Sequence, residues 1–82
     1  MNRILVVEDE EPIANLIRMG LKNAGYHCDV SYDGEDGANR MQAEHYDLIL
    51  LDIMLPKVDG YELLDYAKSM DLPVIFLTAK GR

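Results

Sequence analysis

The sequence predicts an α/β fold built on an open parallel sheet, and three observations lead to that prediction. Short apolar runs alternate along the chain with segments whose apolar residues recur at helical spacing. Three of the four runs are apolar at nearly every position, which is typical of parallel strands buried on both faces. Three of the four runs end abruptly at a polar residue. Strands that alternate with helices join through right-handed crossovers, so the expected order is βαβαβαβ.

The first strand and the first helix are expected near the amino end. Residues Arg3–Val7 form a short apolar run and predict a buried strand. Pro12 follows with the fixed φ that suits a first helical turn, and Gly25 ends the helix. The apolar positions of this helix are Ile13, Leu16, Ile17, Met19, Leu21 and Ala24.

A second strand and a weaker helix follow. Residues His27–Ser31 alternate between apolar and polar side chains, which predicts an exposed edge strand. The Asp33-Gly34 pair signals a turn and a helix start. The helix is expected at about residues 35–44. Its inward positions are expected to be Ala38, Met41 and either Gln42 or Ala43.

The third strand, third helix and fourth strand complete the pattern. Residues 46–51 end in four consecutive apolar residues and run into Asp52. A loop at residues 53–59 leads to Gly60 and a helix, whose apolar face is expected to carry Leu63, Leu64, Ala67 and Met70. Pro73 opens the fourth strand, Val74–Leu77, which ends at Thr78.

Length and composition exclude several classes of protein. The 82 residues suffice for one domain at most. The net charge of −7 disfavours direct contact with nucleic acid or anionic lipid. No apolar run approaches the roughly 18 residues that a membrane span needs, and we expect no signal peptide, so a cytoplasmic location is expected. Cys28 is the single cysteine, which excludes an internal disulfide.

Polar residues at the strand ends are the candidate functional residues. Glu8 and Asp9 follow the first strand, Asp52 the third and Thr78 the fourth. The carboxyl ends of parallel strands meet at one edge of the sheet, where ligands bind. Three carboxylates that lie close together repel one another, and a divalent cation such as Mg²⁺ relieves that repulsion. A carboxylate can also accept a phosphoryl group, and a hydroxyl can donate to its oxygens.

Each of these residues also has a purely structural interpretation. Glu8 and Asp9 could cap the following helix or favour its positive end. Thr78 could be an ordinary strand-end threonine. Asp52 follows four apolar residues, and a charge in that position must be paired, solvated or functional.

Three segments resemble the receiver domains of two-component response regulators, in particular receivers joined to a winged-helix DNA-binding domain. They are Ile4–Glu10, Asp47–Pro56 with the Asp59-Gly60 pair, and Pro73–Ala79. The resemblance extends from Met1 to the end of the chain. It implies a flavodoxin-like, doubly wound parallel sheet.

The resemblance also implies roles for particular residues. Asp52 matches the phosphoacceptor, and Thr78 matches the switch hydroxyl. Glu8 and Asp9 match the acidic pair that holds Mg²⁺, and Met54 matches the position whose backbone carbonyl binds the metal. The implied partner is a sensor histidine kinase, whose phosphohistidine is the donor.

The chain ends where the family continues with a helix, a strand that carries a lysine, and a last helix. We therefore expect residues 1–82 to be a single truncated receiver domain without that helix-strand-helix. The expected function is phosphorelay signalling in a transcription regulator, with no enzymatic turnover of its own. One alternative is a non-phosphorylating fragment that self-associates through its exposed fourth strand. A phosphatase-like hydrolase is disfavoured, since Met54 stands where such an enzyme needs a second acid.

Overall fold

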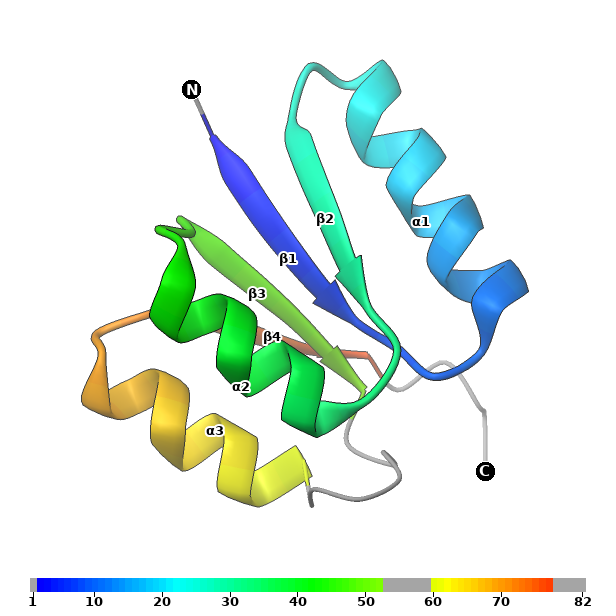
Figure 1. Cartoon of the computed structure of the whole chain (residues 1–82). Helices are drawn as coiled ribbons and strands as arrows, with labels where there is room; N and C mark the ends of the chain where they lie inside the picture. Colours follow the sequence, from blue (N-terminus) through cyan, green and yellow to red (C-terminus); the bar gives the residue numbers. More distant parts are fainter. Residues whose placement is uncertain (1, 53–59, 78–82) are drawn as a thin grey trace.

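The computed structural model describes residues 2–52 and 60–77, and these form one parallel sheet with helices on both faces. The elements are β1 (Arg3–Val7), α1 (Glu11–Asn23), β2 (His27–Ser31), α2 (Gly34–Ala43), β3 (Leu48–Asp52), α3 (Gly60–Ser69) and β4 (Val74–Leu77). The strand order is β2-β1-β3-β4. Figure 1 shows α1 on one side of the sheet and α2 and α3 together on the other. The predicted order and fold class are confirmed.

The two central strands explain why the sequence has near-continuous apolar runs. β1 pairs in parallel with β2 on one side and β3 on the other, and β4 adds to β3. Residues Ile4 to Val7 are all buried, because helices cover both faces of β1. β2 lies at the edge of the sheet, as predicted, and its Cys28, Asp29 and Val30 are half-buried.

The main core lies between the sheet and the α2–α3 layer. Its buried members are Leu5, Val7, Met41, Tyr46, Ile49, Leu51, Leu63 and Ala67. Gly37 lets α2 approach β1 closely, because a Cβ there would lie 3.1 Å from Cγ2 of Val7. That contact is tight, so the glycine brings α2 against the end of the strand that leads into Glu8.

Some apolar residues expected to be inward are exposed. On α1, Leu16 and Met19 are 71% and 60% exposed, and Ala14 is the buried residue of the helix. Gln42 and Ala43 lie inside α2 and are exposed, so the inward face of that helix carries Met41 and the half-buried Ala38 instead. Met70 is also exposed, because α3 ends at Ser69. The helical period was therefore extended past the true end of α3.

A polar network ties the amino ends of the strands together. The Tyr46 hydroxyl donates to Asp29 at 2.8 Å, and the Arg3 guanidinium bonds both Asp29 and Glu44. The same guanidinium lies 5.2 Å from the centre of the Tyr46 ring. Burial and the bond to Asp29 raise the pKa of Tyr46 to about 12. Burial alone would raise the pKa of Asp29, but the bond from Tyr46 and the charges of His27 and Arg3 lower it.

Within the described residues, none of the helices combines the length and the apolar character that a bilayer crossing requires.

Candidate functional site

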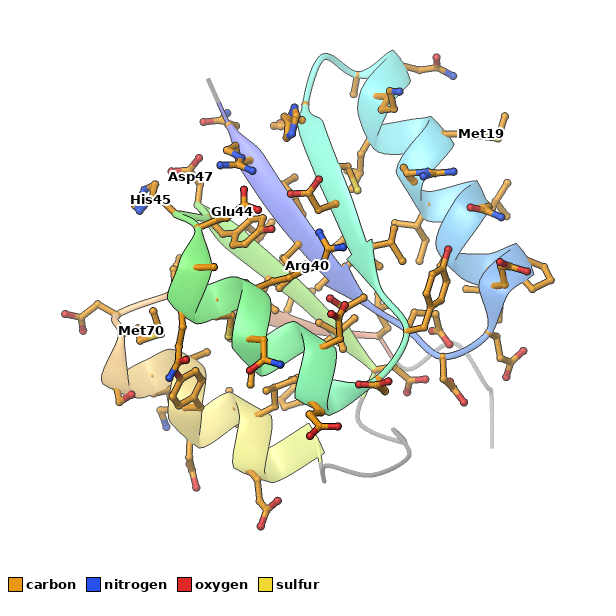
Figure 2. The ribbon with its side chains drawn as sticks, in the orientation of Figure 1. Met19, Arg40, Glu44, His45, Asp47 and Met70 are labelled. Carbon is orange, nitrogen blue, oxygen red and sulfur yellow. The ribbon has the colours of Figure 1, made fainter. Side chains whose placement is uncertain are left out.

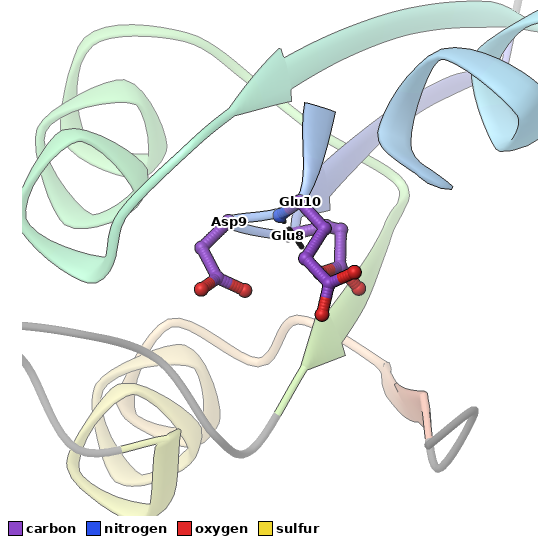
Figure 3. A group of neighbouring side chains, drawn as sticks. All are labelled: Glu8, Asp9 and Glu10. Atoms are coloured by element: carbon purple, nitrogen blue, oxygen red, sulfur yellow. Dashed lines mark hydrogen bonds between the residues drawn. The ribbon is translucent and has the colours of Figure 1, made fainter. Parts of the chain in front are cut away.

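The carboxyl end of β1 delivers three consecutive acids to one place. Glu8 is fully buried, whereas Asp9 and Glu10 are exposed. Carboxylate oxygens of the three side chains lie within 4.8 Å of one another. Figure 3 shows the three carboxylates on the same side, facing the end of β3. No other described group of histidine, cysteine or acidic side chains meets the same criterion.

Backbone hydrogen bonds fix this turn. The Glu8 N–H donates to the carbonyl of Ser31, the last residue of β2, at 3.0 Å, which extends the β1–β2 pairing one residue past the end of β1. The Glu10 N–H donates to Oε2 of Glu8 at 3.1 Å. The Glu8 carboxylate is therefore held against its own chain, while Asp9 projects into solvent.

Asp52 is the last residue of β3 and is only 2% exposed. The β1–β3 register pairs Val7 with Leu51, so the next position on each strand places Asp52 beside Glu8. On its other side Asp52 pairs with Leu77 of β4. The structure thus brings Glu8, Asp9 and Asp52 to one edge of the sheet, as the sequence predicted.

Two expected site residues, Met54 and Thr78, lie outside the described residues. Thr78 follows Leu77 in the chain, and Leu77 is the β4 partner of Asp52. The roles expected for Met54 and Thr78 stay predictions.

Glu10 is a member of the acidic cluster that the sequence reasoning did not single out. Strand alternation would send Glu8 and Asp9 to opposite faces, and it gives no position for Glu10. The chain instead leaves β1 and bends into α1, with Glu10 as the residue before the helix. The run of four acids just before Pro12, Glu8 to Glu11, was the available signal.

The donor set determines which ligands suit this edge. It consists of four carboxylates, exposed in Asp9 and Glu10 and buried in Glu8 and Asp52. Hard cations such as Mg²⁺ and Ca²⁺ prefer oxygen ligands, and Mg²⁺ commonly combines one or two carboxylates with water and phosphate oxygens. Like charges at this spacing repel one another, and a bound cation would offset that repulsion.

Fold and site together define a doubly wound α/β protein with an acidic site at the carboxyl edge of its parallel sheet. The chain belongs to the response regulator receiver domain family, whose model matches residues 4–82. Members of this family are phosphoacceptor signalling domains that bind Mg²⁺ at an acidic phosphorylation site.

Curated relatives match almost the whole chain. The transcriptional regulatory protein DltR of Streptococcus agalactiae is 46% identical over 82 residues, which are 98% of this chain and 37% of the relative. The response regulator ArlR of Staphylococcus aureus is 40% identical over 99% of this chain and 37% of its own length. The chain therefore spans little more than a third of these relatives.

Solved structures agree with the fold. The response regulator TrrA of Thermotoga maritima, solved in complex with Mg²⁺-BeF, superposes with a TM-score of 0.90 at 38% identity. That match covers 96% of this chain and 70% of TrrA. The receiver domain of the Francisella response regulator 1452 gives a TM-score of 0.89 at 30% identity, over 100% of this chain and 69% of the other.

Proposed function

We propose that this chain is a phosphorelay receiver module in which Asp52 accepts a phosphoryl group from a sensor histidine kinase, with Mg²⁺ bound. The observation that carries the proposal is the position of Asp52. It is a buried carboxylate at the end of a central strand, in register beside Glu8 and the acidic cluster. A carboxylate at the end of a buried apolar strand costs free energy unless its charge is compensated there.

The residues take distinct roles in this proposal. Asp9 is exposed and would bind the cation directly, together with Asp52. Glu8, held by the Glu10 N–H, would reach it through a water molecule. Met54 would contribute its backbone carbonyl. When bound, Mg²⁺ supplies the positive charge that lets a phosphoryl group approach an acidic site.

The chemical step needs little from the chain beyond position and charge. A carboxylate oxygen of Asp52 forms a bond to phosphorus as the phosphorus–nitrogen bond of the kinase phosphohistidine breaks. The imidazole nitrogen then keeps the electron pair of that bond and takes a proton from solvent. The Thr78 hydroxyl would donate to an oxygen of the new aspartyl phosphate. The chain would act once per phosphoryl group and would not turn over a substrate.

The biological setting follows from the relatives. DltR is a transcriptional regulatory protein and ArlR is a response regulator. We propose that residues 1–82 are the receiver portion of a regulator of transcription that works in the cytoplasm. The acidic net charge of −7 supports signalling without direct nucleic-acid contact by this portion.

Acetyl phosphate with Mg²⁺, read by intact mass, tests the proposal. The expected result is a gain of one phosphoryl group that Asp52→Ala abolishes and that removal of Mg²⁺ prevents. A folded protein, shown by circular dichroism, that gains no phosphoryl group would refute it. A gain that persists in Asp52→Ala would place the acceptor elsewhere.

A second candidate function is self-association, and Ile75 favours it. Within the described chain β4 has a strand partner on one side only, and Ile75 on this strand is 52% exposed. An apolar, unpaired edge strand is a template for pairing with another chain. Sedimentation at tens of micromolar should show a dimer that Ile75→Lys dissociates. A wild-type monomer under these conditions would exclude this function.

A further inference from the structure

A cavity lies between two connections of the chain, away from the acidic cluster. The α2–β3 and α3–β4 connections enclose a cavity of about 430 Å³. Met41 and Tyr46 of the core line it, together with Met70 and Leu72. Both connections precede a strand, whereas Asp52 follows one, so this cavity lies at the end of the sheet opposite the phosphoacceptor.

Acidic side chains surround this apolar lining. Glu44, Asp47 and Asp71 all line the cavity and are all exposed. Figure 2 shows Glu44, His45 and Asp47 gathered where α2 gives way to β3, with Met70 on the neighbouring connection. Glu44 is paired with Arg3, and Asp47 accepts the Arg3 N–H at 2.8 Å. The Asp71 side chain has no partner among the described residues.

The backbone that carries Asp71 is fixed before any ligand arrives. Asp71 has a φ of 57°, in the left-handed region that favours glycine or asparagine. Its N–H donates to the carbonyl of Lys68, and the N–H of Leu72 donates to Ala67. These bonds hold the backbone of Asp71 at the rim, and aspartate is one of the few residue types besides glycine that adopt this conformation readily.

We infer that this cavity, which we call the acidic pocket, docks a basic segment of a partner polypeptide. An arginine or lysine of the partner would face Asp47 and Asp71, and a neighbouring apolar side chain would lie on Met70 and Leu72. Arg3, which does not line the pocket, already stacks on Tyr46 and pairs with Glu44, so Asp47 and Asp71 are the acids that would meet the partner's cation. A bare metal ion fits less well, since the described acidic pocket holds no three ligand groups within reach of one ion.

The location has a consequence for signalling. Because the acidic pocket and Asp52 lie at opposite ends of the sheet, a partner held here leaves the phosphoacceptor edge open. The docking does not depend on phosphorylation, so it can be tested whether or not Asp52 accepts a phosphoryl group.

The experiment is a titration of the isotope-labelled protein with the amidated peptide Lys-Leu-Arg-Leu-Lys, followed by amide chemical shifts in excess Mg²⁺. Saturable shifts are expected at residues 44–47 and 70–72. Asp71→Asn should weaken binding about threefold, as for the loss of one exposed ion pair. Asparagine also suits the left-handed backbone, so this variant should fold. Glu35→Gln, which removes one exposed acid at the other end of α2, should leave the affinity unchanged.

Three outcomes would overturn the inference. Shifts centred on Glu8 to Glu10 would mean general attraction to the most acidic edge. Equal binding of a peptide with glycine in place of both leucines would show that apolar contacts with Met70 and Leu72 do not contribute to the affinity. Equal binding of spermidine at the same amides would show a site for small cations rather than for a polypeptide.

Discussion

The hydroxyl of Tyr46 donates a 2.8 Å hydrogen bond to the carboxylate of Asp29, and this bond connects the start of β3 to the edge strand β2. Tyr46 is 1% exposed and belongs to the core, so the bond fixes a large buried ring at the end of the molecule opposite Asp52. Arg3 joins the same carboxylate from β1. Three strands are thereby held in register at one point.

The first prediction concerns the strength of that bond. Tyr46→Phe keeps the ring and removes the hydroxyl, which leaves Asp29 with Arg3 and His27 as its partners. Since a bond to a charged group contributes more than a neutral one, the free energy of unfolding should fall by about 1–2 kcal/mol. Urea unfolding followed by circular dichroism measures it. An unchanged midpoint would show that Arg3 and His27 satisfy Asp29 without the hydroxyl.

The second prediction is a pH dependence with a defined sign. The pKa of Tyr46 rises from 10.0 to about 12 on folding, through burial and then the bond to Asp29. A group whose folded pKa is raised contributes stability that is complete below its unfolded pKa and is lost as pH rises. Wild type should therefore lose stability between pH 10 and about 12, and Tyr46→Phe should lose less over that interval. Parallel slopes for the two proteins would contradict the assigned pKa.

The third prediction concerns Ser31. Its side chain is fully buried, and its Oγ has no hydrogen-bond partner among the described residues. An unsatisfied buried hydroxyl costs free energy, so Ser31→Ala should stabilise the protein by about 1 kcal/mol. Ser69→Ala is the matched control, because the Ser69 Oγ is exposed and donates to the carbonyl of Tyr66. Thermal unfolding should rank Ser31→Ala above wild type and Ser69→Ala at or slightly below it.

Strand positions were the most predictable part of the fold. β1 is buried on both faces, and β3 is buried on one face and half-buried on the other, so their apolar runs are continuous and stop where the acidic edge begins, at Glu8 and Asp52. The convergence of these acids followed from parallel topology alone. The same reasoning could not supply Glu10, because the turn that directs it depends on how the chain enters α1.

Helix faces were less predictable, for a physical reason. A period of 3.6 residues identifies which side chains share a face, but it does not show how far the neighbouring layer extends. Leu16 lies in the α1 pattern and is nonetheless exposed. The bond between Tyr46 and Asp29 was equally hidden, since it joins residues on different strands whose partners sequence spacing does not reveal.

The last prediction separates the members of the acidic cluster by their affinity for Mg²⁺, and it rests on the proposed function. Asp9 is exposed and faces the end of β3, whereas Glu8 is buried and accepts the Glu10 N–H. Asp9→Asn should weaken Mg²⁺ binding by at least about tenfold, because it removes a direct ligand charge. Glu10→Gln should weaken it only about twofold, through the loss of a nearby charge that the cation does not contact. Isothermal titration calorimetry measures both.

The control for this comparison is Glu35→Gln, which makes the same change of net charge in the first turn of α2. It should bind Mg²⁺ like wild type if the effect is local. Equal losses in Asp9→Asn, Glu10→Gln and Glu35→Gln would show that Mg²⁺ responds only to the overall charge of −7. A larger loss in Glu10→Gln than in Asp9→Asn would instead make Glu10 the direct ligand, since its carboxylate lies in the same cluster as that of Glu8.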